Sequence, residues 1–117
     1  MRHHNNKRKF GREKNQRNAL INSLALNLIV REKIKTTEPK AKELRPFIEK
    51  IITRAKKNDL ASHKLIVSRL FNRKKEVKKV FEKLAPKYKD VSGGYTRIIK
   101  LGARKSDGAK MAIIEFI

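Results

Sequence analysis

The longest uncharged stretch of this chain, the thirteen residues from Asn18 to Val30, sets a narrow limit on what the chain can fold into. Charged side chains make up 37% of the 117 residues, so few other segments can be enclosed on several sides. A membrane helix needs roughly 20 apolar residues, whereas this stretch is shorter and contains Asn22, Ser23 and Asn27. It is therefore typical of a buried helix in a small soluble domain.

The balance of charge is the second constraint. Thirty-two Lys and Arg residues outnumber eleven Asp and Glu residues, which gives a formal net charge of +21. Such a charge opposes the compact state by self-repulsion and attracts polyanions. Because 38% of the residues are hydrophobic, the chain is not merely a disordered basic tail. A small folded body with this charge most often binds nucleic acid. Without cysteine it forms neither disulfides nor thiolate metal sites.

Four segments carry apolar residues at helical spacing and predict helices. They run from residue 11 or 12 to residue 31, and over residues 38–55, 60–71 and 74–84. Thr37 is placed to cap the second helix, and Pro86 is expected to end the fourth. Pro46 falls inside the second helix, where it removes a hydrogen bond. Since the apolar stripe stays in phase on both sides of Pro46, we expect one bent helix there.

Three segments have the alternation or the β-branched residues of strands. They are residues 33–37, 95–101 and 111–117, the last two joined by a loop at 102–108 that contains Asp107-Gly108. This pattern predicts a hairpin, which needs a third strand or a covering helix to be stable. We therefore expect the α+β class, with about four helices packed on a small three-stranded mixed sheet and a basic N-terminal arm. Residues 1–117 would form one domain, with the arm at 1–11 and the α+β body at 12–117.

No arrangement of residues typical of an active site is found in the sequence. Asp59, Asp90 and Asp107 lie in predicted loops or at helix ends, and the glutamates sit among Lys and Arg on helix faces, as expected for surface charge balance. No glycine loop has phosphate-binding spacing, and Ser, His and acidic residues do not cluster. We expect no enzyme activity and no cofactor.

The opening segment MRHHNNKRKFGR, residues 1–12, carries five Lys or Arg residues, two histidines and no acidic residue. It lacks the apolar core or the serine-rich amphipathic character of a targeting peptide. A histidine at position 3 can bind Cu(II), but any short peptide with that placement would do the same. We expect His3 and His4 to contact bases or phosphates, with no metal site, and the segment to be an arm that RNA orders.

The fourth predicted helix has a face that favours a polyanion. Lys74 and Lys78, and likewise Lys75 and Lys79, are like-charge pairs at four-residue spacing. Each pair destabilises an isolated helix by a few tenths of a kcal/mol, which a bound polyanion would offset. The alternative is an ordinary solvated face.

The predicted hairpin loop is the second such surface of the body. Arg104 and Lys105 lie between Gly102 and Gly108, so a flexible loop can bring both cations close to a phosphate backbone. The alternative is an ordinary exposed hairpin end.

Four blocks of the sequence occur in the same order in a known family. They are MRHHNNKRKFGR, KIKTTEPKAKELRPFIEKIIT, LAPKYKDVSGGYTRIIKLG and SDGAKMAIIEF. With them the whole chain resembles the L-seventeen family of bacterial large-ribosomal-subunit proteins. The resemblance implies a cytoplasmic structural and assembly component without catalytic residues or cofactor. It also implies binding to large-subunit ribosomal RNA beside other ribosomal proteins, near the exit of the nascent-chain tunnel, with no membrane contact and no homo-oligomer in the ribosome.

The resemblance also implies which residues contact RNA. The basic N-terminal segment of the family maps to Arg2, His3, Lys7, Arg8, Lys9, Arg12 and Arg17, and its GGYTRI block maps to Tyr95 and Arg97. Together with the two basic surfaces, the residues expected to bind RNA are Arg2, His3, His4, Lys7, Arg8, Lys9, Arg12, Lys14, Arg17, Lys74, Lys75, Lys78, Tyr95, Arg97, Lys100, Arg104 and Lys105. The chain departs from the family at Gln16, where histidine is frequent, and at Lys110, where proline is usual.

Two other classes of protein compete with the ribosomal one. A free DNA-binding or nucleoid protein would need a recognition helix after a tight turn, and none stands out. A basic RNA-processing enzyme is disfavoured because no carboxylate cluster is present. Sedimentation with the large subunit, with release only at high salt, would separate the ribosomal class from both.

Overall fold

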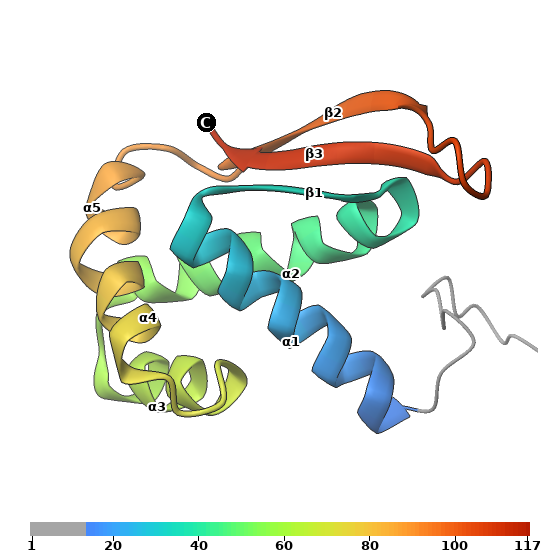
Figure 1. Ribbon diagram of the computed structural model, residues 1–117. Coiled ribbons are helices and arrows are strands. Elements are labelled where there is room, and N and C mark those ends of the chain that lie inside the picture. Colours follow the sequence, from blue (N-terminus) through green and yellow to red (C-terminus); the bar gives the residue numbers. More distant parts are fainter. Residues whose placement is uncertain (1–13) are drawn as a thin grey trace, which may run out of the picture.

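The computed structural model describes residues 14–117, which form a three-stranded sheet and a group of helices. Figure 1 shows the sheet across one side of the molecule, with the helices packed on its other side. The elements in chain order are α1 (Lys14–Arg31), β1 (Lys33–Thr37), α2 (Glu38–Lys57), α3 (Leu60–Arg69), α4 (Lys74–Lys79), η1 (Val80–Leu84), α5 (Ala85–Lys87), β2 (Thr96–Ala103) and β3 (Lys110–Phe116). The predicted α+β class is confirmed.

The sheet is antiparallel throughout, with the strand order β1-β3-β2. The expectation of a mixed sheet is therefore wrong. β1 and β2 run in the same direction, but β3 lies between them and opposes both, so no parallel pair forms. Between Lys100 and Ala103 the pairing shifts by one residue, and such a bulge increases the local twist of a strand.

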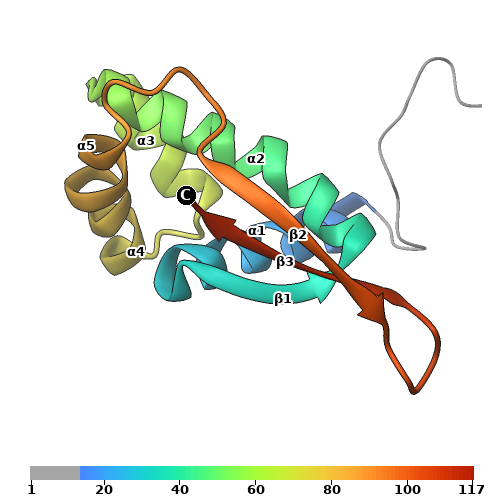
Figure 2. The same ribbon diagram turned by 90° about the horizontal axis from the view of Figure 1, so that it is seen from above.

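The two faces of the sheet differ in what covers them. Ala112, Ile114 and Phe116 alternate along β3 onto the face that packs on α2, and all three are buried. In Figures 1 and 2 no described helix lies over the opposite face. Ile99 of β2 points to that face and is 42% exposed. The core thus lies between the sheet and the helices.

The helix α2 is the centre of this core. Ala41, Leu44, Ile48 and Ile52 are fully buried and follow one another by about one turn, so they form a single stripe. Burying each large aliphatic side chain contributes roughly 1.5–3 kcal/mol. α2 contacts all three strands as well as α1, α3, η1 and α5, and it runs unbroken through Pro46. The prediction of one helix across the proline is confirmed.

The fourth predicted helix continues past the proline expected to end it. The elements α4, η1 and α5 follow one another without a break, and α5 includes Pro86. In η1 the backbone widens to a π-helix, where the Ala85 N–H donates to the Val80 carbonyl five residues earlier. A proline offers no N–H and its ring crowds the carbonyl four residues before it. The hydrogen bond from Ala85 reaches one residue further back than in an α-helix. The helix therefore continues into Pro86 and does not end before it.

Two local expectations are wrong. Thr37 occupies the N-cap position of α2, but its side chain makes no capping hydrogen bond. The third helix was predicted over residues 60–71, yet α3 ends at Arg69 and Phe71 is 45% exposed. The backbone turns at Phe71 and Asn72, which both have positive φ (55° and 57°), and this turn carries the phenyl ring away from the core.

Candidate nucleic-acid interface

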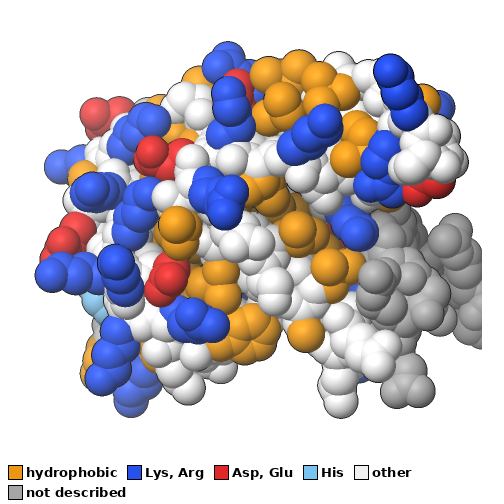
Figure 3. Space-filling view, in the orientation of Figure 1, with side chains coloured by type: hydrophobic (Ala, Val, Ile, Leu, Met, Phe, Trp, Pro, Cys, Tyr) orange, Lys and Arg blue, Asp and Glu red, His pale blue; other side chains and the backbone are white. Residues whose placement is uncertain are grey.

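Lysine and arginine side chains are spread over the surface. Figure 3 shows them across the whole of one face, with few acidic groups among them and a group of hydrophobic side chains along the edge where β2 lies. Ten of the predicted RNA-binding residues belong to the part of the chain that the structure describes. The other seven lie outside it, and they are Arg2, His3, His4, Lys7, Arg8, Lys9 and Arg12.

The lysines of α4 form the first basic surface. Lys74, Lys75 and Lys78 are exposed, and within residues 14–117 none of them has an ion-pair partner. Lys79, the fourth lysine, turns to the end of α1, where its Nζ donates to the Val30 carbonyl (3.1 Å) and lies 4.0 Å from Glu32 Oε1. Three of the four lysines are thus free for an outside anion.

The hairpin presents a second basic surface on the uncovered face of the sheet. Arg97 of β2 stands directly opposite Glu115 of β3, and Arg97 Nε donates to Glu115 Oε1 at 2.7 Å. The Arg97 side chain remains 58% exposed. Lys33 and Lys35 of β1 lie opposite Glu115 and Ile113 in the register and are exposed. Sequence reasoning missed these two lysines, although their alternation with Ile34 and Thr36 was a signal that could have found them.

Lys100 lies on the other side of β2, near the start of α2. Its Nζ is 3.7 Å from Glu38 Oε1, and Lys42 Nζ approaches the same oxygen at 2.9 Å. The hydrogen bond from Lys42, together with the nearby positive charges, lowers the pKa of Glu38. Glu38 is in the first turn of α2, where a negative charge is favourable to the helix dipole. The carboxylate therefore attracts both Lys42 and Lys100 to the start of α2.

The loop of the hairpin is braced from within. Arg104 Nη2 lies 2.5 Å from Asp107 Oδ2 and Arg104 Nε donates to Asp107 Oδ1 at 3.0 Å, so the pair is bidentate. Asp107 Oδ1 also accepts from the Ala109 N–H at 3.1 Å. The hydrogen bond from Arg104, with that from Ala109, lowers the pKa of Asp107 to about 2. Lys105 is left as the cation at the exposed tip of the loop.

Tyr95, one of the residues expected to contact RNA, holds parts of the fold together. Its side chain is 1% exposed and belongs to the core. Its hydroxyl lies 3.1 Å from Thr53 Oγ1 and accepts from Lys56 Nζ at 3.1 Å, while its ring packs against Tyr88. Tyr95 therefore attaches the segment that leads into β2 to the helix α2.

The predicted residues do not form one patch. Figures 1 and 2 both show the hairpin loop and the first turn of α1 at one end of the molecule, and α4 toward the other. Within that end they lie apart, because Figure 1 shows the loop beside the sheet and the start of α1, which carries Lys14 and Arg17, on the helix side. The hairpin-loop cations and the α4 lysines are separated by the body of the protein.

Metal ligands and catalytic groups do not converge in the described chain. Residues 14–117 hold no cluster of three or more His, Asp or Glu side chains able to bind a metal. His63 lies flat against Phe81, with ring centroids 3.7 Å apart, and its Nε2 is 3.1 Å from Asn58 Oδ1. No helix in this range is apolar over enough of its length to cross a bilayer.

A small α+β body with a formal net charge of +21 and exposed cations on the hairpin and on α4 has the charge pattern typical of nucleic-acid-binding proteins. The profile of the family described as ribosomal protein L17 matches residues 20–117, and the chain belongs to this family. Membership confirms that the chain is a ribosomal protein and not an enzyme.

Curated relatives match along their whole length. Large ribosomal subunit protein bL17 of Campylobacter concisus is 48% identical over 117 residues, covering all of this chain and 98% of that protein. The bL17 of Nautilia profundicola is 48% identical over 120 residues with the same coverage. That of Persephonella marina is 50% identical over 118 residues, covering all of this chain and 95% of its own.

Proposed function

We propose that the chain is a structural constituent of the large ribosomal subunit and binds its ribosomal RNA. The observation that carries this is the near-half identity, along the whole length, to proteins named for that subunit. The subunit gives the chain a cytoplasmic location and other ribosomal proteins as neighbours. A place near the exit of the nascent-chain tunnel follows from the family resemblance alone.

The mechanism is neutralisation of phosphates by cations that the fold holds in place. Each Lys or Arg that contacts a phosphate releases condensed counterions, so the affinity falls steeply as salt rises. Such contacts position a protein on nucleic acid without reading its sequence. The arm at 1–11, the α4 lysines and the hairpin cations supply these contacts.

The separation of the basic groups gives the proposal its geometry. The hairpin-loop cations and the α4 lysines lie toward opposite ends of the body. One RNA helix cannot run along both of them without passing over the body. We therefore assign the two groups to different RNA segments, which makes the protein a clamp between parts of the folded RNA.

Fractionation tests the proposal. Extracts are separated on sucrose gradients at increasing salt, and the protein is followed in each fraction. It should sediment with large subunits and leave only at high salt, and deletion of residues 2–9 should cause release at lower salt. A protein that runs free at low salt, or stays with DNA, contradicts the proposal.

A further inference from the structure

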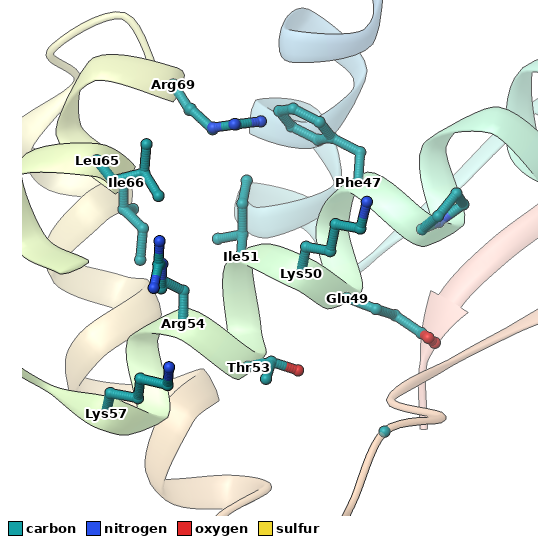
Figure 4. A pocket seen from close by; sticks show the side chains of 12 residues that line it. Phe47, Glu49, Lys50, Ile51, Thr53, Arg54, Lys57, Leu65, Ile66 and Arg69 are labelled. Carbon is teal, nitrogen blue, oxygen red and sulfur yellow. The ribbon is translucent and has the colours of Figure 1, made fainter. Parts of the chain in front are cut away.

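A groove between α2 and α3 is not accounted for by the surfaces described above. Its volume is about 570 Å³. The side chains of Phe47 and Ile51 from α2, and of Leu65 and Ile66 from α3, form an apolar floor, and Figure 4 shows Ile51 and Ile66 directed into the space between the helices. A hollow of this size is in the range of small-ligand sites.

The rim of this groove is strongly basic. Lys50, Arg54 and Lys57 are spaced by four and three residues on α2, and Arg69 comes from α3. At 1.5 Å per residue the α2 cations follow one another by about 6 and 4.5 Å along the helix, which is comparable to the distance between neighbouring phosphates of one strand. Within residues 14–117 there is no ion-pair partner for Lys50, Arg54 or Lys57. Four cations line one opening, so the groove complements an anionic chain.

The only carboxylate on the lining does not compete for these cations. Glu49 turns away from the groove toward the strand, as Figure 4 shows. Its Oε2 accepts from Thr96 Oγ1 at 2.9 Å and from the Thr96 N–H at 3.3 Å, and Arg45 Nε is 3.6 Å away. The role of Glu49 is to hold β2 on α2.

Phe47 and Arg69, referred to below as the platform, lie together at one side of the groove. The Arg69 guanidinium is 5.9 Å from the centre of the Phe47 ring, and Figure 4 shows the two side chains directed toward each other. This distance is within the range of a cation–π contact. Aromatic rings and guanidinium planes are the surfaces on which proteins stack the unpaired bases of RNA. The platform and the row of cations therefore suit one base and its flanking phosphates.

We propose that this groove holds an unpaired nucleotide of ribosomal RNA. The base stacks on the Phe47–Arg69 platform, and the flanking phosphates contact Lys50, Arg54 and Lys57. The inference rests on the proposed RNA-binding function and adds a fourth contact, separate from the arm, the hairpin and the α4 lysines. A protein segment would also place an apolar side chain on the floor. The four cations favour an RNA strand, because it carries a negative charge at every nucleotide.

The test uses two substitutions that keep charge and apolar character. Phe47→Leu removes the ring, and Arg69→Lys removes the guanidinium plane. Matched controls are Phe71→Leu and Arg73→Lys, the same changes at an aromatic and an arginine that do not line the groove. Each variant replaces the native chain in cells, and large subunits are isolated. Mass spectrometry gives the occupancy of the protein, and dimethyl sulfate measures the reactivity of unpaired bases.

One or a few unpaired nucleotides should gain reactivity about fivefold or more with both groove variants, at unchanged occupancy, because stacking contributes about 1–3 kcal/mol per base. The controls should leave the same bases protected. Identical reactivity of native and variant subunits at full occupancy overturns the inference. Crosslinks that join Lys50 or Lys57 to a neighbouring protein also overturn it, because a protein segment then fills the groove. Phe47 packs partly on the core, so the exposed Arg69 variant decides if the other fails to fold.

Loss of the native chain from purified subunits is a different result. It would refute the proposed ribosomal function itself, and the two failures are thereby distinguished.

Discussion

The two basic regions of the body, the hairpin and α4, are built differently. Along the hairpin each of three cations has a carboxylate partner, in the pairs Arg97–Glu115, Lys100–Glu38 and Arg104–Asp107. On α4, by contrast, Lys74, Lys75 and Lys78 have no such partner within residues 14–117. These three hairpin cations are paired within the protein itself. The α4 lysines repel one another and are stabilised only by an outside anion. The hairpin thus carries paired cations, whereas α4 carries unbalanced positive charge.

The largest effect is expected from the α4 lysines. Changing Lys74, Lys75 and Lys78 together to Gln should lower the affinity for large-subunit RNA about 50- to 150-fold near 0.15 M salt, because three phosphate contacts are lost. The slope of log affinity against log salt should become less steep by about two to three. Filter binding over a salt series measures both. An unchanged slope would mean that this face is merely solvated.

The burial of Tyr95 gives the next prediction. Tyr95→Phe removes the hydroxyl that Thr53 and Lys56 contact, so the free energy of unfolding should fall by about 1 kcal/mol. RNA affinity should stay within twofold of the native value, because the buried ring touches no RNA. Urea unfolding and filter binding on the same preparation measure the two quantities. A large loss of affinity without a loss of stability would restore Tyr95 to the interface.

Substitutions on the hairpin and on α4 should change the free energy of unfolding in opposite directions. Arg97→Gln breaks a cross-strand ion pair and should lower the free energy of unfolding by about 0.2–1 kcal/mol. Lys75→Gln relieves like-charge repulsion with Lys79 and should raise it by a few tenths. Both remove one positive charge, so each serves as the control for the other in thermal or urea unfolding without RNA. Equal changes of the same sign in the free energy of unfolding would remove the distinction between the hairpin and α4.

The smallest effect concerns the acid range. The pKa of Asp107 is lowered to about 2, against roughly 3.9 for an unperturbed aspartate. The Arg104–Asp107 pair should therefore be fully formed above about pH 4 and be lost as the pH falls through about 2. Carbon-detected NMR of the Asp107 carboxyl follows this titration. A midpoint near 4 would show that the loop is not braced, and Asp107→Asn should give the opened loop at every pH.

Most of the fold follows from short-range patterns in the sequence. The α2 stripe predicted a helix through Pro46, and the Asp-Gly loop between two alternating segments predicted the hairpin. The π-helical turn before Pro86 was not predictable, because it depends on how the chain packs on α2. Phe71 misled for a related reason: the helical pattern continued, but the backbone turned at positive φ.

The candidate sites divide in the same way. Lysines on α4 were found because their spacing is local. The groove was missed because Phe47 and Arg69 lie on different helices and only tertiary packing brings them together. The burial of Tyr95 was not predicted, because a sequence block shows which residues a family shares and does not show whether they serve the fold or the ligand.

The strand order has a consequence for how the chain matures during synthesis. β3 joins β1 to β2, yet residues 38–109 separate it from β1. At roughly 5–20 residues per second, β1 waits about 4–16 s for its partner strand. Through that interval the unpaired backbone of β1 and the apolar side of α2 have no sheet to close on. The net charge of +21 makes such incomplete chains repel one another and attracts them to polyanions, and both effects oppose aggregation until the sheet forms.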